Sequence, residues 1–163
     1  MASVRTVIGV MGSGVDGDAA LLSQARDLGR AIAGQGWVLL NGGRDAGIMH
    51  ASAQGASEAG GFVVGVLPGT DGRESSSFLD IQILTGLGDA RNAVNVLSCD
   101  VVIALRGGAG TLSEIALALC AGRTVVTLGR DDAGTFAGMG DVVATSSVDG
   151  AIAAVAAALA KRG

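Results

Sequence analysis

Proline and aromatic residues are the scarcest components of this 163-residue chain, which contains 1 proline, 1 tryptophan, 3 phenylalanines and no tyrosine. Proteins that bind single-stranded nucleic acid stack the bases on aromatic side chains, so this scarcity disfavours such a partner. Glycine, by contrast, is abundant at 28 residues, and hydrophobic residues make up 49% of the chain. This composition is typical of a compact α/β protein rather than a disordered one.

Charge is also sparse. Charged residues make up 16% of the chain, and 15 acidic residues against 11 lysines and arginines give a formal net charge of -4. A nucleic-acid-binding protein needs a basic surface to meet the phosphate backbone, so we expect no nucleic acid partner. The expected partner is a small molecule.

Cysteine is limited to Cys99 and Cys120, which lie in apolar surroundings without the spacing of a metal site. We therefore expect two buried thiols in a reducing compartment and no bound metal. The chain enters a strand pattern almost at once, without the regions of a signal peptide, and its longest apolar tract, residues 151–160, is too short to cross a bilayer. These observations predict a cytoplasmic protein that does not enter the membrane.

Apolar runs of strand length alternate with helical patterns along the whole chain. Strands are predicted at residues 4–11, 37–40, 62–67, 81–84, 101–105, 124–128 and 141–144, and helices at 19–35, 48–59, 89–98, 111–121 and 151–161. Asp18 is the expected N-cap of the first helix. The alternation predicts one ligand-binding domain over residues 1–163, an α/β fold with a doubly wound, mostly parallel sheet and helices on both faces. Ligands of such folds bind beyond the carboxyl ends of the strands, and a polar segment at 69–78 is predicted to be a mobile loop near that site.

Glycine turns follow the first two predicted strands. Residues 12–17 match the Gly-x-Gly-x-x-Gly pattern, but residues 40–42 after the second strand are Leu-Asn-Gly and supply no acidic residue for a ribose hydroxyl. A dinucleotide site is therefore not expected, and the first turn either lines a ligand cleft or only joins a strand to a helix. No Gly-Lys-Ser/Thr sequence indicates a P-loop, and the single histidine, His50, is expected on a helix surface without a catalytic triad.

The third glycine turn, within residues 100–120, is the most informative segment. Residues 101–105 form an apolar run typical of a strand covered on both faces, and Gly107, Gly108 and Gly110 allow the backbone to approach a ligand closely. Thr111 is the expected cap of the next helix, whose N-terminus would attract a phosphate. Thr111 and Glu114 also spell a Thr-x-x-Glu capping box, in which Glu114 only closes back on the cap. From this segment alone both interpretations remain open.

Three blocks resemble the superfamily of cytokinin riboside monophosphate phosphoribohydrolases, also called lysine decarboxylase-like proteins. The blocks are Asn-Gly-Gly-Arg-Asp-Ala-Gly-Ile-Met at 41–49, Val-Gly-Val-Leu-Pro at 64–68, and Ala-Arg-Asn at 90–92 followed by Arg-Gly-Gly-Ala-Gly-Thr-Leu-Ser-Glu at 106–114. Within the superfamily the chain is most similar to molybdenum cofactor carrier proteins, over nearly its whole length. The segments that carry this likeness are 8–12, 36–37, 43–44 and 84–88.

The resemblance implies a Rossmann-like fold, a homo-oligomer (dimer or tetramer) and molybdenum cofactor, a phosphate-bearing pterin, as the bound ligand. Although Met49 also fits a core position, the implied ligand-binding residues come from all three turns and the helix before the third. They are Gly12, Ser13, Gly14, Gly42, Gly43, Arg44, Gly47, Met49, Arg91, Arg106, Gly107, Gly108, Gly110 and Thr111.

The same resemblance leaves a nucleotide-binding enzyme open as the alternative. The hydrolase branch carries Pro-Gly-Gly-x-Gly-Thr-x-x-Glu after an Arg-Lys pair, whereas this chain has Arg106 in place of proline and Asn92 in place of lysine. If the chain cleaves the N-glycosidic bond of nucleoside 5'-monophosphates, the catalytic residues are Arg91, which would hold the ligand, and Glu114, which would stabilise the ribosyl cation. Without the resemblance, Arg91 would be taken for an exposed ion-pair partner of Asp89. These two departures favour a carrier function rather than hydrolysis.

Overall fold

The computed structural model describes residues 4–15 and 18–162, which form a seven-stranded sheet with helices on both faces. The strands are β1 (Val7–Met11), β2 (Val38–Asn41), β3 (Phe62–Leu67), β4 (Ile81–Leu84), β5 (Val101–Ala104), β6 (Thr124–Leu128) and β7 (Val142–Thr145). Their order in the sheet is β4-β3-β2-β1-β5-β6-β7, and every strand pair is parallel. The predicted α/β class and parallel sheet are confirmed.

Five α-helices and two short 3₁₀ segments connect these strands. The α-helices are α1 (Ala19–Gly34), α2 (Gly47–Glu58), α3 (Arg91–Leu97), α4 (Ala109–Cys120) and α5 (Val148–Ala160), and the 3₁₀ segments are η1 (Gly88–Ala90) and η2 (Ala133–Phe136). Asp18 caps α1 as predicted, because its side chain accepts hydrogen bonds from Ala20 N and Leu21 N.

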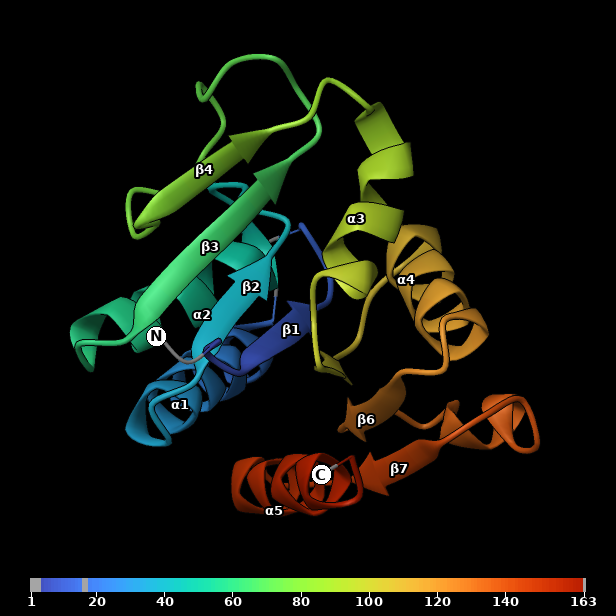
Figure 1. Ribbon diagram of the computed structural model, residues 1–163. Helices are drawn as coiled ribbons and strands as arrows, with labels where there is room; N and C mark the ends of the chain where they lie inside the picture. The colour runs from blue at the N-terminus through green and yellow to red at the C-terminus, as the bar shows by residue number, and fades with distance from the viewer. Residues whose placement is uncertain (1–3, 16–17, 163) are drawn as a thin grey trace.

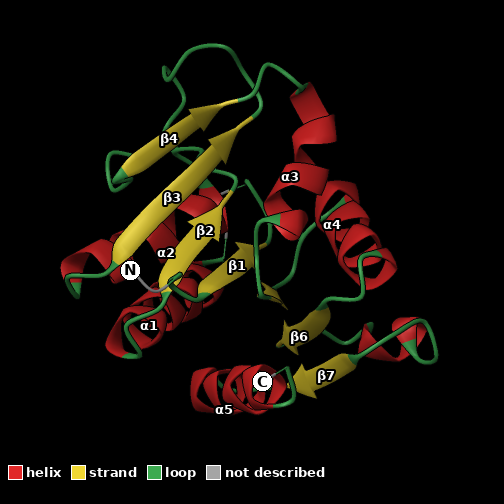
Figure 2. Cartoon of the chain, in the orientation of Figure 1, coloured by secondary structure: helices red, strands yellow, loops and turns green. Residues whose placement is uncertain are grey.

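The helices divide between the two faces of the sheet. Figure 1 shows α1 and α2 behind β1 and β2, with α3 and α4 on the opposite side, and α5 packs with α1 against the first face. Figure 2 shows the same layers by secondary structure. Strand β1 pairs with β2 from Val7↔Val38 and with β5 from Ile8↔Val101. The chain therefore reverses its direction of travel across the sheet between β1 and β5, which is where ligands bind in folds of this type.

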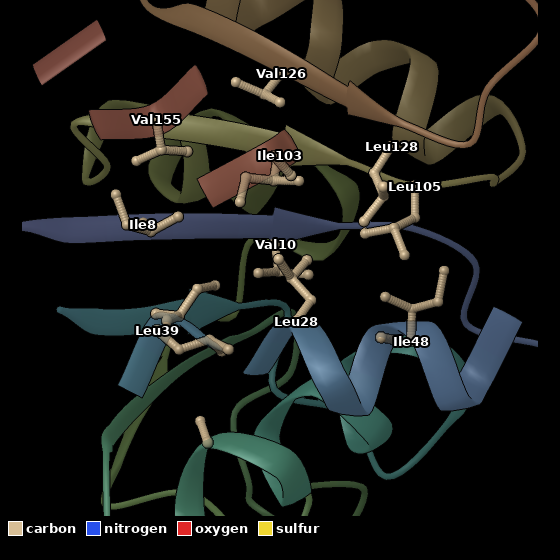
Figure 3. Packing of buried hydrophobic residues seen from close by; sticks show 14 of the residues in the cluster. Ile8, Val10, Leu28, Leu39, Ile48, Ile103, Leu105, Val126, Leu128 and Val155 are labelled. Carbon is tan, nitrogen blue, oxygen red and sulfur yellow. The ribbon is translucent and has the colours of Figure 1, made fainter. Parts of the chain in front are cut away.

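The larger hydrophobic core fills the space between the sheet and the first helix layer. In Figure 3, Ile8 and Val10 of β1 lie between Leu28 and Leu39 on one side and Ile103 on the other, and all five are fully buried. A second cluster under α3 and α4 contains Met11, Leu40, Val102 and Ile115 among others. Central strands are therefore apolar on both faces, as the run at 101–105 predicts.

Two glycines allow α1 and α2 to pack with their backbones in contact. A Cβ atom at Gly29 would overlap the carbonyl of Ser52, and one at Gly55 would overlap the carbonyl of Arg26. Close approach of the two helices fixes the start of α2, and with it the glycine turn that precedes this helix.

Several expectations are wrong in detail. Cys99 is buried, but Cys120 at the end of α4 is exposed, because the helix turns this position away from the sheet. Helix α5 begins at Val148 rather than residue 151, since Ser147 accepts a hydrogen bond from Gly150 N and caps it earlier. Strand β1 begins at Val7 rather than at residue 4, because its pairing with β2 starts at Val7.

Candidate functional site

A cavity of about 340 Å³ opens at the carboxyl ends of β1, β2 and β5. We call it the glycine cleft, and it is lined by Val10, Met11, Gly12, Ser13, Gly14, Val15, Gly42, Arg44, Met49, Asp89, Arg91, Asn92, Gly108, Gly110, Thr111 and Glu114. Four segments distant in sequence supply these residues: the turns after β1 and β2, the start of α3, and the first turns of α4. The parallel sheet brings them together because it places all three glycine turns at the same edge.

Most of the residues singled out from the sequence line this cleft. Those that do are Gly12, Ser13, Gly14, Gly42, Arg44, Met49, Arg91, Gly108, Gly110, Thr111 and Glu114. Gly43 and Gly47 are not among the lining residues, and Arg106 and Gly107 line a neighbouring cavity. Gly47 has a φ of 53°, and a Cβ atom there would overlap the carbonyl oxygen of Ser13. The backbone conformation of the turn therefore accounts for glycine at this position.

Ser13 joins the three turns through its backbone. Its N–H donates to the carbonyl oxygen of Arg106 over 3.0 Å, and its own carbonyl oxygen accepts from Ile48 N over 2.9 Å. The turn after β1 is thus bonded to the turn after β5 and to the start of α2. These two bonds hold the three glycine turns together at the cleft.

Helix α4 begins earlier than predicted. Its N-cap is Gly108, with no side-chain cap, and its first residue is Ala109, so the predicted N-cap role of Thr111 is wrong. The capping box is also not formed, because the carboxylate of Glu114 accepts from Asn95 instead. The first N–H groups of a helix have no partner within it, and Gly108 and Gly110 bring this end of α4 to the cleft. The open end of α4 is therefore able to receive an anion.

Arg91 is buried without a partner. It is 9% exposed, and it forms no hydrogen bond or ion pair with the residues that the structure describes; its Nε atom is among the buried polar atoms without a partner. Burial lowers the pKa of its guanidinium, and the charge of Glu114 opposes this shift. The alternative of an exposed ion pair with Asp89 is wrong, because Arg91 is buried and pairs with no carboxylate among the described residues. A Cβ atom at Gly42 would overlap its guanidinium, so glycine there makes room for it.

Glu114 lies in the same cleft and is 7% exposed. Its Oε1 accepts a hydrogen bond of 2.9 Å from Nδ2 of Asn95, a side chain of α3 that is 0% exposed. Burial raises the pKa of the Glu114 carboxyl, while the hydrogen bond from Asn95 and the charge of Arg91 act in the opposite direction. Asn95 was not predicted as a site residue; its spacing of four residues from Arg91 on one helix was the available signal.

The polar segment 69–78 packs beside the turn after β2. Arg44 forms an ion pair with Glu74 over 3.1 Å, and the N–H of Ser76 donates to the carbonyl oxygen of Gly43 over 2.8 Å. The prediction that this segment lies near the site agrees with these contacts, and its mobility stays a prediction. The half-exposed Arg44 also contributes a positive charge at the rim of the cleft.

His50 has closer polar neighbours than the sequence indicates. Its Nδ1 lies 2.5 Å from Oδ1 of Asp45 and 3.1 Å from Oγ of Ser76, and its ring packs near Phe78 at 5.2 Å between centroids. Both polar partners contact the same ring nitrogen, so the imidazole does not relay a proton from Ser76 to Asp45 as a catalytic triad requires.

A second cavity of about 470 Å³ adjoins the glycine cleft on the other side of Ser13. It is lined by Ser13, Val15, Asp18, Leu21, Arg106, Gly107, Arg130, Asp131 and Asp132. Arg106 contacts Asp18 there over 3.4 Å, and the buried Arg130 donates to the carbonyl oxygen of Leu105 over 2.7 Å and pairs with Asp132. Sequence reasoning missed Arg130 because β6 has no glycine turn that resembles the other three.

Within residues 4–15 and 18–162, no group of three or more His, Cys, Asp or Glu side chains is arranged to hold a metal ion. In the same part of the chain, no helix combines the length and the apolar character needed to cross a membrane.

Comparison with known proteins gives consistent matches. The sequence profile of the SLOG cluster4 family matches residues 5–155. The molybdenum cofactor binding protein from the phototrophic bacterium Rippkaea orientalis superposes with a TM-score of 0.93 at 42% identity, covering 97% of this chain and 99% of that one. The molybdenum cofactor carrier protein of Chlamydomonas reinhardtii gives a TM-score of 0.89 at 47% identity, covering 96% and 99%.

A third match is more distant. The cytokinin riboside 5'-monophosphate phosphoribohydrolase of Mycobacterium tuberculosis is 39% identical over 99 residues, which are 60% of this chain and 53% of that protein. The chain therefore spans about half the length of this relative.

Proposed function

We propose that this chain, which belongs to the SLOG cluster4 family, binds molybdenum cofactor in the glycine cleft and carries it without catalysing a reaction. Support comes from the solved structures that match nearly the whole chain at 42% and 47% identity, which are a molybdenum cofactor binding protein and a molybdenum cofactor carrier protein. We expect the carrier to be a homo-oligomer.

One observation of the structure carries the proposal. Arg91 is a buried guanidinium without a partner, and it lines the same cleft as the uncapped N-terminus of α4. A buried charge is costly unless an opposite charge or hydrogen-bond acceptor meets it. The phosphate of the cofactor supplies both, and it also suits the open N–H groups of α4.

The lining residues then divide by role. Gly108, Gly110 and Thr111 cradle the phosphate at the start of α4, and Arg91 and Arg44 supply positive charge beside it. The walls that enclose the pterin are formed by Gly12, Ser13, Gly14, Gly42 and Met49. Gly43, Gly47 and Gly107 shape the turns behind these walls, and Arg106 faces the second cavity.

The second candidate function is hydrolysis of a nucleoside 5'-monophosphate. It is favoured by the presence of Glu114 and Arg91 in one cleft, where the carboxylate would stabilise a ribosyl cation. Two residues argue against it: Asn92, which lines the cleft, stands in place of lysine, and its uncharged amide donates to Ser113 Oγ over 3.0 Å. Arg106, which stands in place of proline, faces away from the cleft.

Two parallel assays on the purified chain test the proposal. In the first, the protein is mixed anaerobically with molybdenum cofactor and passed over a gel-filtration column, and molybdenum and pterin are measured in the protein peak. In the second, a panel of nucleoside monophosphates is incubated with the protein and released base is measured. We expect molybdenum and pterin to co-elute with the protein and no base to be released. Robust base release that collapses in Glu114→Gln would overturn the carrier and establish the hydrolase.

A further inference from the structure

We infer that Glu114 selects the ligand by its hydrogen-bond donors, accepting the ring N–H and the 2-amino group of a 2-amino-4-oxopyrimidine edge, which pterins and guanine share. This inference rests on the proposed function, because it names the residue that binds the edge of the pterin away from the phosphate. It gives Glu114 a role in a carrier that performs no hydrolysis.

The first argument is the hydrogen-bonding capacity of Glu114. An ionised carboxylate only accepts, and it has about four lone-pair directions on its two oxygens. Among the described residues Glu114 accepts one hydrogen bond, from Asn95 Nδ2 to Oε1. The side chain lines the cleft, so its remaining acceptor positions are available to a ligand inside the cavity.

The second argument is the orientation of the carboxylate. Asn95 is fully buried, and its Nδ2 donates to Glu114 while its own Oδ1 has no hydrogen-bond partner. The amide of Asn95 therefore serves to hold the carboxylate rather than to complete a network of its own. A fixed acceptor pair recognises two donors on one planar edge better than a mobile side chain does, since less conformational freedom is lost on binding.

The third argument is the distance to the phosphate position. Gly108 caps α4 and Glu114 lies six residues further along the helix, a rise of about 9 Å at 1.5 Å per residue. A fused-ring ligand whose phosphate meets the N-terminus of α4 thus presents its opposite edge to Glu114. Both positions line the same cavity of about 340 Å³.

These arguments predict discrimination between nucleobases that differ only in this edge. Guanine offers a ring N–H and a 2-amino group, so the carboxylate receives two donors. Hypoxanthine keeps the ring N–H but lacks the amino group, and adenine places a ring nitrogen lone pair where guanine has its N–H. An acceptor facing an acceptor is left unsatisfied, which is costly in a buried site.

The test uses three nucleotides that share the same ribose and phosphate. Affinities of guanosine, inosine and adenosine 5'-monophosphate are measured by titration calorimetry for wild type, Glu114→Gln and the matched control Glu58→Gln, a substitution on the outer surface of α2. We expect wild type and Glu58→Gln to bind the guanine nucleotide at least about tenfold more tightly than the adenine nucleotide, with the hypoxanthine nucleotide between them. In Glu114→Gln the three affinities should fall within about threefold of one another, since the amide offers one acceptor and one donor. Equal affinities in wild type, or an unchanged ranking in Glu114→Gln, would overturn the inference.

A fourth ligand separates this inference from the proposed function. Neopterin monophosphate, a stable pterin that bears a phosphate, is titrated in parallel. If wild type binds it but does not rank the nucleotides, the role of Glu114 is wrong and the carrier proposal stands. If the nucleotide affinities have the expected order but neither neopterin monophosphate nor molybdenum cofactor binds, the cleft selects guanine nucleotides and the carrier proposal fails. If none of the ligands binds, both are overturned.

Discussion

Asn95 donates a 2.9 Å hydrogen bond to Glu114 from one side of its amide, while the oxygen on the other side has no partner. The pair joins α3 to α4 at the glycine cleft, where Glu114 is 7% exposed and lines the cavity while Asn95 is fully buried behind it. A buried carboxylate held by a neutral amide, with Arg91 as its nearby positive charge, is less stable in its ionised form than a carboxylate in water.

The pH dependence of stability should therefore change in Glu114→Gln. Burial raises the pKa of Glu114 in the folded protein, so its contribution to stability is fully present below the pKa of the unfolded chain and is lost as the pH rises through the folded pKa. Each unit of increase corresponds to about 1.4 kcal/mol. We expect Glu114→Gln to be more stable than wild type at pH 8, with the difference shrinking toward pH 4, as measured by urea unfolding.

Glu58 provides the control, because its pKa is shifted in the opposite direction. Hydrogen bonds from Arg26 and Arg30 lower its pKa, so its contribution is present above the unfolded pKa and is lost as the pH falls through the folded pKa. Glu58→Gln should thus gain nothing at pH 8. A Glu114→Gln variant that is less stable than wild type at pH 8 would contradict the expectation.

Arg91→Met should separate binding from folding. The substitution removes a buried charge that has no partner, so we expect the free energy of unfolding to rise by on the order of 1 kcal/mol while affinity for inorganic phosphate falls at least about tenfold. Phosphate binding is measured by calorimetry at millimolar concentrations. The matched variant Arg26→Met removes an exposed arginine paired with Glu58 and should leave phosphate binding unchanged. Unaltered phosphate affinity in Arg91→Met would argue against a phosphate beside this residue.

Gly108→Val should fold and fail to bind. The φ of Gly108 is -92°, which valine adopts, and a Cβ atom there meets no atom within 4 Å, so the new side chain occupies the cleft. We expect a circular dichroism spectrum like that of wild type and no detectable binding of neopterin monophosphate. Gly34→Val, where a Cβ atom also meets nothing within 4 Å, is the control and should bind normally. Normal binding by Gly108→Val would mean that the ligand is held elsewhere.

The neighbouring Gly107 should behave differently. A Cβ atom at Gly107 would overlap Oγ1 of Thr111, so Gly107→Val forces the turn to move and should destabilise the protein by about 1–3 kcal/mol. Thermal unfolding of Gly108→Val and Gly107→Val compares a side chain added in the open cleft with one added in the packed turn. Similar melting temperatures for both would contradict this distinction.

The exposed apolar side chains predict a homo-oligomer. Large apolar side chains are exposed on three elements, among them Leu97 on α3, Leu112 and Leu117 on α4, and Ile81 and Ile83 on β4. Contact with a second copy of the chain would remove this apolar surface from water. Light scattering at micromolar concentration should give the mass of two or four chains. Leu117→Lys should shift the protein toward smaller species, whereas Val4→Lys, at a residue that is also exposed, should not. A monomeric wild type would refute the prediction.

The layout of the fold could be predicted because the buried strands are apolar runs that alternate with helical patterns, and three of them end in a glycine turn. Strands β3, β4 and β6 have the predicted bounds, and the α-helices that connect β1 to β2, β2 to β3, β4 to β5 and β5 to β6 account for the parallel arrangement of most of the sheet. The start of α4 could not be predicted, since Thr111 and Gly108 are both acceptable caps by sequence. The backbone bond from Ser13 to Arg106 is a tertiary contact that no local pattern encodes.

Part of the candidate site could also be predicted from the sequence, and part could not. The family resemblance predicted Arg91 and Glu114 together, and the structure places both in one cavity. The burial of Arg91 and its lack of a partner depend on how α3 packs against the turn after β2, and the orientation of Glu114 depends on Asn95. The second cavity was missed because Arg106 and Arg130 meet only after β6 lies beside β5.

Ser13 has a mechanical consequence for any molecule that occupies this edge of the sheet. It lines both cavities and is bonded on one side to the turn after β5 and on the other to the start of α2. Val15 of the same turn also lines both cavities, so a shift of this turn changes the shape of both cavities at once.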